Sequence, residues 1–141
     1  ASRGLGDVYK RQVPLPGNKE AFVNFTDIIG KRLEEKDSIV IYPEAHIWPY
    51  YTKIRPFKDM SFRYPAQYHA PVFCFTNVYR KRKLRKTPRM ITYVDGPFIA
   101  DSLIPIKEQK AYLRNKVYDA MTARSKNNNV EIIKYIRLEN E

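Results

Sequence analysis

The sequence has little of the material from which disulfide scaffolds and metal centres are built. Among 141 residues it has one cysteine and two histidines. A single cysteine excludes an internal disulfide, and we expect Cys74, which lies in an apolar run, to be a buried and inert thiol typical of a reducing compartment. His46, His69 and Cys74 stand at no recognised metal-ligand spacing. The sequence therefore predicts no metal site.

Long hydrophobic runs are also missing, and acidic side chains are outnumbered. No apolar stretch approaches the roughly 18 to 20 residues that cross a bilayer, so no membrane-spanning segment is predicted. The 26 Lys and Arg residues exceed the 15 Asp and Glu residues, which gives a net charge of +11. This charge predicts an anionic partner, whether lipid headgroup, nucleic acid or phosphorylated cofactor. The hydrophobic content of 43% is too high for a disordered chain, and the length allows one domain with a real core.

The N-terminal residues 1–12 (ASRGLGDVYKRQ) show no periodicity. They resemble translated adapter sequence from the broken end of a gene assembly, and we interpret them as non-native; the alternative is a flexible arm. Residues 13–17 are expected to be an extended piece punctuated by prolines. On this interpretation residues 13–141 are the C-terminal portion of one domain whose natural chain began upstream.

Hydrophobic periodicity predicts alternating helices and strands. Apolar residues at helical spacing indicate a helix over residues 19–36, capped by Asn18, and a second from Pro105 to about Lys126. The apolar face of the first carries Phe22, Phe25, Ile28, Ile29 and Leu33; that of the second carries Leu113, Val117, Ala120 and Met121. Short apolar runs predict buried strands at 39–42, 70–78 and 90–94, the last ended by Asp95-Gly96-Pro97, and residues 61–68 suit a short helix or turn.

The stretch Ser38–Arg63 combines a predicted strand end with charged side chains. Pro43 stops the strand, and Glu44 follows at the position where open α/β sheets place their ligands. Four cations come next, namely Lys53, Arg55, Lys58 and Arg63. One carboxylate and several cations suit a substrate that carries hydroxyls and phosphate. The alternative is a turn with a solvated acid.

Three blocks in this region resemble, in order and spacing, the lysophosphatidic acid (1-acylglycerol-3-phosphate) acyltransferase family. Residues 42–47 (YPEAHI) match the family's Phe-Pro-Glu-Gly-Thr-Arg block, and residues 56–62 (PFKDMSF) match its Pro-Phe-Lys-x-Gly-x-Phe segment. Residues 70–72 (APV) match the start of the strand that follows. The resemblance covers about residues 13–123. It implies an α/β fold, part of a glycerolphosphate acyltransferase-like domain with a mixed sheet flanked by helices.

The resemblance implies transfer of an acyl group from a coenzyme A or acyl-carrier-protein thioester to the hydroxyl of a lysophosphatidate-like glycerol phosphate, in phospholipid synthesis. No cofactor is implied beyond this co-substrate. The partners would be an anionic membrane surface, a lysophospholipid acceptor and the thioester donor, at the cytoplasmic face of the membrane and peripheral to it. The residues expected to bind substrate are Pro43, Glu44, His46, Lys53, Arg55, Lys58 and Arg63.

The sequence departs from the family pattern at Ala45 and His46, where the family has glycine and threonine, and at Met60 or Ser61, where it has glycine. Two further departures bear on the chemistry. Ile47 stands where the family has an arginine, and isoleucine cannot make a bidentate phosphate contact, so a neighbouring cation substitutes or the acceptor differs. The family's catalytic base is a histidine followed five residues later by an aspartate. Tyr51 and Cys74 occupy that place after His46 and His69. We therefore expect the pair to lie upstream of this chain, and the chain alone to be inactive.

Two other functions remain open at this stage. One is a non-catalytic relative that binds anionic lipid, which the missing arginine favours. The other is a basic nucleic-acid-binding module. Against this function, the aromatic rings do not interleave with the run of seven cations between Tyr79 and Arg89. That run suits either a lipid-facing surface or a solvated hairpin loop. Trp48, Tyr50 and Tyr51 suit a membrane interface, a cap on an acyl tunnel, or ordinary packing.

Overall fold

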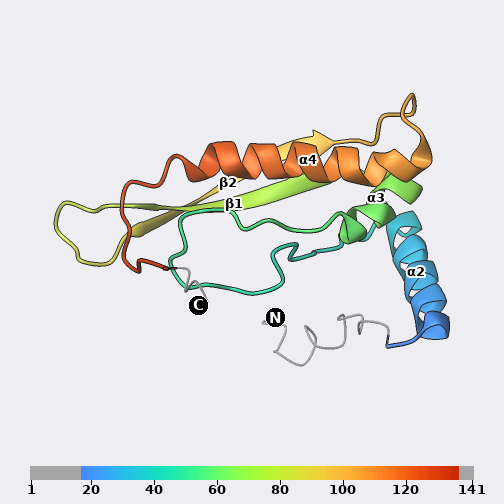
Figure 1. The fold of residues 1–141 in the computed structure, drawn as a ribbon, viewed down its shortest axis with the longest axis horizontal. Helices are drawn as coiled ribbons and strands as arrows, with labels where there is room; N and C mark the ends of the chain where they lie inside the picture. Colours follow the sequence, from blue (N-terminus) through green and yellow to red (C-terminus); the bar gives the residue numbers. More distant parts are fainter. Residues whose placement is uncertain (1–16, 137–141) are drawn as a thin grey trace, which may run out of the picture. The chain divides into compact units, whose positions relative to one another are not determined.

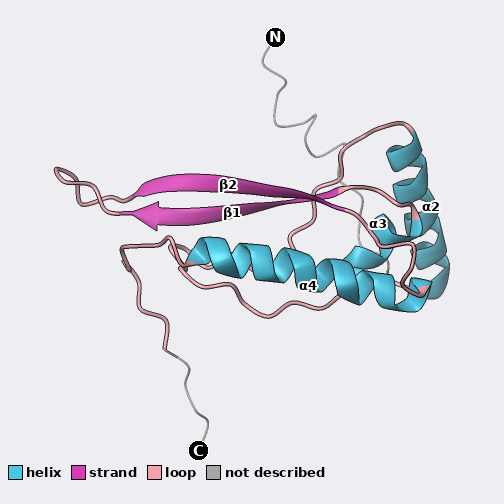
Figure 2. Cartoon of the chain, turned by 90° about the horizontal axis from the view of Figure 1, so that it is seen from above, coloured by secondary structure: helices cyan, strands magenta, loops and turns pink. Residues whose placement is uncertain are grey.

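The computed structural model describes residues 17–136. The predictions for residues 1–12, and for all but the last residue of 13–17, fall outside this range. The chain divides between Val40 and Ile41 into two compact units, a first unit up to Val40 and a second unit from Ile41, and each is described by itself. The described residues hold three α-helices and a two-stranded antiparallel sheet, as in a small α/β domain (Figures 1 and 2).

The first unit contains helix α2 (Lys19–Glu34), which confirms the helix predicted from periodicity. The Asn18 side chain accepts a hydrogen bond of 2.7 Å from the Ala21 N–H, so the predicted cap is confirmed as well. On the predicted apolar face Ile29 is buried, whereas Ile28 is exposed. The buried stripe is therefore narrower than the sequence suggested.

Residues 39–42 do not form the predicted strand. They are irregular, and Val40 and Tyr42 expose 76% and 74% of their surface. A strand needs a neighbour to satisfy its backbone N–H and C=O groups, and the two strands of the described chain pair with each other. A favourable composition is not sufficient without such a neighbour. Glu44 consequently follows an irregular segment and not the end of a sheet strand.

The sheet is a hairpin of β1 (Val72–Arg80) and β2 (Arg89–Phe98) joined by residues 81–88. Two predicted strands are thus confirmed, but within residues 17–136 the sheet is antiparallel and not mixed. The predicted end of the third strand at Asp95-Gly96-Pro97 is wrong, because β2 continues through it. The register shifts opposite this point, and Gly96 adopts a φ of 131°. A Cβ at Gly96 would lie 2.6 Å from the Val72 carbonyl oxygen, so only glycine fits.

The hairpin is packed on one face only. Cys74, Thr76 and Val78 are buried, which confirms the predicted burial of the Cys74 thiol. Phe73 and Phe75 point to the other face and expose 51% and 65% of their surface. The interpretation of 70–78 as a strand covered on both faces is therefore wrong. Its continuous apolar sequence reflects two apolar faces, of which helix α4 covers one.

Helix α4 (Ile106–Ser125) confirms the second predicted helix and lies along the hairpin (Figures 1 and 2). Its buried side chains include Leu113, Val117 and Met121, as predicted. The 3-10 turn η1 (Met60–Phe62) and the short helix α3 (Arg63–Gln67) pack against α4, in agreement with the predicted short helix or turn. The core cluster comprises Phe57, Phe62, Ala66, Cys74, Ala100, Leu113, Val117 and Met121.

A run of three asparagines, Asn127–Asn129, follows α4 and ties it to the end of β1. The Asn128 side-chain oxygen accepts a 2.7 Å hydrogen bond from the Tyr79 N–H. The Asn129 side-chain oxygen accepts one of the same length from the Lys81 N–H. We call this run the asparagine strap. It fixes the base of the 81–88 loop.

Candidate functional site

Glu44 and Arg55, two of the predicted site residues, are joined within the second unit. The Arg55 backbone N–H donates to Glu44 Oε2 at 3.0 Å, and Arg55 Nη2 donates to the Glu44 carbonyl at 2.8 Å and also to the His46 carbonyl. Arg55 Nε lies 3.4 Å from Glu44 Oε2. Only 25% of the Glu44 side chain and 16% of the Arg55 side chain are exposed. The Glu44 carboxylate is therefore fixed by Arg55 and is not a solvated turn acid.

Arg55 also contacts an aromatic cluster made of Trp48, Tyr51 and Tyr135. Its guanidinium lies 4.6 Å from the centre of the Trp48 ring. Trp48 stacks on Tyr135 at 4.9 Å and meets Tyr51 edge-on at 5.1 Å. Arg55 therefore stabilises the 44–55 loop through these contacts. The phosphate contact predicted for it stays a prediction. Of the three roles considered for Trp48 and Tyr51, ordinary packing is the one these contacts support.

The backbone at Ala45 lies in the left-handed region, with φ of 64°. The Ala45 N–H donates to the Tyr42 carbonyl at 3.1 Å and the His46 N–H to the Glu44 carbonyl at 2.8 Å. This turn directs the chain back toward Arg55. The left-handed region costs a residue with a Cβ roughly 1 kcal/mol or more of conformational free energy, whereas glycine adopts it without this cost.

The other predicted site residues differ in how far they are exposed. Pro43 is partly buried in the turn before Ala45, whereas His46, Lys53, Lys58 and Arg63 are exposed. Lys58 follows Phe57, which is buried in the core, so its backbone is firmly placed. The structure therefore brings Glu44 and Arg55 together and leaves the remaining cations on the surface of the same unit.

An ion pair that the sequence did not predict joins β2 to α4. Asp95 accepts from Arg124 through both carboxylate oxygens, at 2.6 Å from Nη2 and 2.9 Å from Nε. These hydrogen bonds lower the pKa of Asp95 and raise that of Arg124. Burial raises the pKa of the Cys74 thiol, and the negative charge of Asp95 raises it further by a smaller amount. A raised pKa suits the inert role expected of this thiol. The paired residues are too far apart in the sequence for any local pattern to reveal them.

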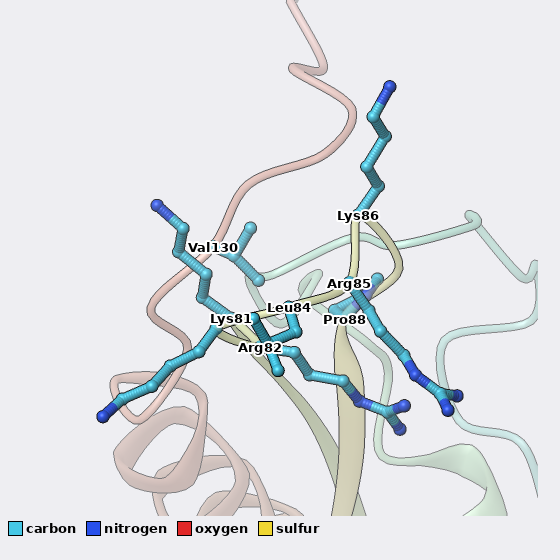
Figure 3. A pocket seen from close by; sticks show the side chains of 8 residues that line it. Lys81, Arg82, Leu84, Arg85, Lys86, Pro88 and Val130 are labelled. Carbon is cyan, nitrogen blue, oxygen red and sulfur yellow. The ribbon is translucent and has the colours of Figure 1, made fainter.

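The basic run between Tyr79 and Arg89 lies in the loop of the β1–β2 hairpin. A hairpin loop was one of the two interpretations of this run. We call residues 81–88 the basic loop. All of them except Thr87 line an open hollow together with Val130, and their cationic side chains point in several directions (Figure 3). Residues 81–87 are all exposed.

Within residues 17–136, no group of three or more His, Cys, Asp or Glu side chains is placed to hold a metal ion. None of the helices in this part of the chain is long and apolar enough to cross a membrane. Comparison of the chain with protein-family models, with curated proteins and with solved structures finds no match. The acyltransferase resemblance consequently depends on the residues of its three sequence blocks alone.

Proposed function

We propose that this chain is the acceptor-binding portion of an acyltransferase that acylates a lysophosphatidate-like glycerol phosphate. The observation that carries the proposal is the turn after Glu44. The family has a glycine directly after its acid, and the residue at that position here, Ala45, has the positive φ that favours glycine. The sequence lacks the glycine, and the backbone at this position has the left-handed conformation that glycine adopts most readily.

Glu44 has the chemistry to fix the acceptor. Arg55 holds its carboxylate in place, and a held carboxylate can accept a hydrogen bond from a glycerol hydroxyl. Lys53, Lys58 and Arg63 supply positive charge for the acceptor phosphate. In the transfer, the acceptor hydroxyl oxygen attacks the thioester carbonyl and its proton passes to a histidine base. The C–S bond then breaks, and the histidine returns the proton to the leaving thiolate. A His-x4-Asp pair outside these 141 residues would provide that base.

The uncovered face of the hairpin supports assignment to a larger α/β layer. Phe73, Phe75 and Val94 are exposed together, with Phe75 directly opposite Val94 across the two strands. The irregular segment 39–42 carries apolar side chains that also lack cover. Further strands and helices of an acyltransferase domain would bury both. We propose a peripheral location at the cytoplasmic face of a membrane, where the lysophospholipid acceptor lies.

A second candidate, favoured by Ile47, is a lipid-binding relative without catalysis. Ile47 exposes 85% of its surface at the position where the family's arginine would meet phosphate. The source gene separates the two candidates. A His-x4-Asp pair encoded upstream supports the enzyme, and its absence from the whole gene product supports the lipid-binding relative.

The experiment that tests the proposal is Glu44→Gln in the protein as its gene encodes it. Glutamine keeps an oxygen that can accept from the Arg55 N–H, so the loop is retained while the negative charge is lost. We expect acyl transfer from acyl-CoA to lysophosphatidate to fall on the order of 100-fold, since acceptor positioning is impaired. Glu131→Gln, an exposed acid of the same unit, serves as the matched control and should leave the rate unchanged. Equal rates for Glu44→Gln and the unaltered protein would remove Glu44 from the site.

The turn itself can be tested by Ala45→Gly. Glycine relieves the left-handed strain at residue 45, and we expect the free energy of unfolding of the second unit to rise by about 1 kcal/mol. Ala123→Gly is the matched control: Ala123 is exposed and helical, so the same change should lower stability by about 1 kcal/mol. Urea unfolding of both variants measures the difference. A loss of stability in Ala45→Gly would contradict the match to the family's glycine.

A further inference from the structure

The basic loop concentrates positive charge that no ion pair within residues 17–136 neutralises. Residues 79–94 contain no Asp or Glu, and the cations of this run are Arg80, Lys81, Arg82, Lys83, Arg85, Lys86 and Arg89. The ion pairs within residues 17–136 involve none of them. Arg55 and Arg124, by contrast, are each engaged by a carboxylate. The cations of the loop are therefore available to an anionic partner.

A single apolar side chain stands in the middle of these cations. Leu84 exposes 96% of its surface, more than any other large hydrophobic residue in the described chain. The side chains of Arg82 and Arg85 point to one side of the loop and that of Lys86 to the other (Figure 3). Leu84 is thus surrounded by cations on a loop with no apolar packing of its own. This combination fits a bilayer interface, where an apolar group enters the acyl region and cations remain among the headgroups.

The loop is presented on a firm base. The asparagine strap holds the Tyr79 and Lys81 N–H groups where β1 ends. Arg80 Nη1 donates to the Asn127 carbonyl at 2.6 Å, which ties the same point to the end of α4. Both ribbon views show the loop extending past the last turn of α4 (Figures 1 and 2). A flat surface can therefore reach the loop before it meets α4.

We propose that the basic loop docks the protein on anionic bilayers, with Leu84 inserted and the surrounding Lys and Arg side chains on lipid phosphates. The loop carries no aromatic ring for stacking on bases and no Asn or Gln for reading them, so its chemistry favours lipid over nucleic acid. The docking rests on the proposed function only in that a lysophospholipid acceptor lies in a membrane. It uses residues separate from Glu44.

The test is binding of the purified 141-residue chain to vesicles, measured by sedimentation. The vesicles are phosphatidylcholine alone, or phosphatidylcholine and phosphatidylglycerol in equal parts. We expect binding to the anionic vesicles that weakens with salt, and little binding to the neutral ones. The variant Lys81→Gln/Arg82→Gln/Lys83→Gln should bind about 100-fold more weakly, because each cation near the surface contributes about a fivefold factor.

Two further variants locate the contact and test the insertion. Lys107→Gln/Lys116→Gln/Lys134→Gln removes the same charge from exposed positions elsewhere in the second unit and should bind within a few-fold of the unaltered chain. Leu84→Ser keeps all the charge and should weaken binding about tenfold. Equal losses in the two triple variants would overturn the assignment to the loop. Unchanged binding by Leu84→Ser would overturn the insertion.

Competition with a single-stranded oligonucleotide completes the test. We expect the vesicles to retain the chain at matched phosphate concentration. Release of the chain to the oligonucleotide would overturn the preference for lipid. None of these measurements uses acyl transfer, so a failure of the docking proposal and a failure of the Glu44 assignment are recognised separately.

Discussion

The two faces of the β1–β2 hairpin have similar apolar character and opposite surroundings. On the inner face, Cys74, Thr76 and Val78 are buried beneath α4. On the outer face, Phe73, Phe75 and Val94 remain exposed. Both faces carry apolar side chains, and within the described residues only the inner face is covered. Exposed apolar surface of this kind marks a place where another element packs, which agrees with the proposal of a larger α/β layer.

The same substitution on the two faces gives the largest expected contrast. Val78 has no exposed surface, so Val78→Ala should lower the free energy of unfolding by about 2 kcal/mol through lost burial and the cavity left behind. Val94→Ala, on the outer face, should change it by less than about 0.5 kcal/mol. Urea unfolding of the chain measures both. Similar losses at the two positions would mean that the outer face is packed as well.

Two threonines sharpen the comparison. Thr76 is buried on the inner face, and its hydroxyl has no hydrogen-bond partner among the described residues. Thr76→Val should therefore stabilise the chain by about 1 kcal/mol, because an unmet polar group is removed from the interior. Thr92, on the outer face, donates a 2.7 Å hydrogen bond to Asn77 Oδ1 in an exposed setting. Thr92→Val should cost only a few tenths of a kcal/mol. A melting temperature lowered by Thr76→Val would show that its hydroxyl is satisfied.

The smallest expected effect concerns the ion pair at the inner face. Arg124 lowers the pKa of Asp95 in the folded state, so the pair contributes stability that is complete above the unfolded pKa of about 4 and is lost as the pH falls through the lower folded value. Asp95→Asn should reduce stability at neutral pH and flatten its fall in acid. Thermal unfolding between neutral and acid pH checks this, with the exposed Asp119→Asn as control. An unchanged acid slope in Asp95→Asn would assign the acid loss to other carboxylates.

Local patterns in the sequence predicted most of the elements. Apolar residues at helical spacing indicated α2 and α4, and Asn18 indicated the start of α2. The hairpin and its basic loop followed from two apolar runs separated by charge. These features depend on neighbours a few residues apart, which is the information that a periodicity carries.

The remaining features depend on partners distant in the sequence. Residues 39–42 have the composition of a strand but lack a neighbour to pair with. The turn at Gly96 did not end β2, because the register shift near Val72 accommodates it. For the site, the sequence indicated Glu44 and Arg55 individually. It did not indicate that the arginine would hold the glutamate, since that contact forms only when the intervening loop folds back.

The asparagine strap limits how the sheet can grow. It occupies backbone groups of Tyr79 and Lys81 that β2 does not use, on the edge of β1 that faces away from the hairpin partner. A side-chain amide does not offer the repeating backbone N–H and C=O groups with which a further strand would pair. A strand added by β-augmentation would therefore pair along Phe73–Asn77 and stop before Tyr79. Any sheet completed on this edge extends from the α3 end of β1, and the opposite end stays clear for the basic loop.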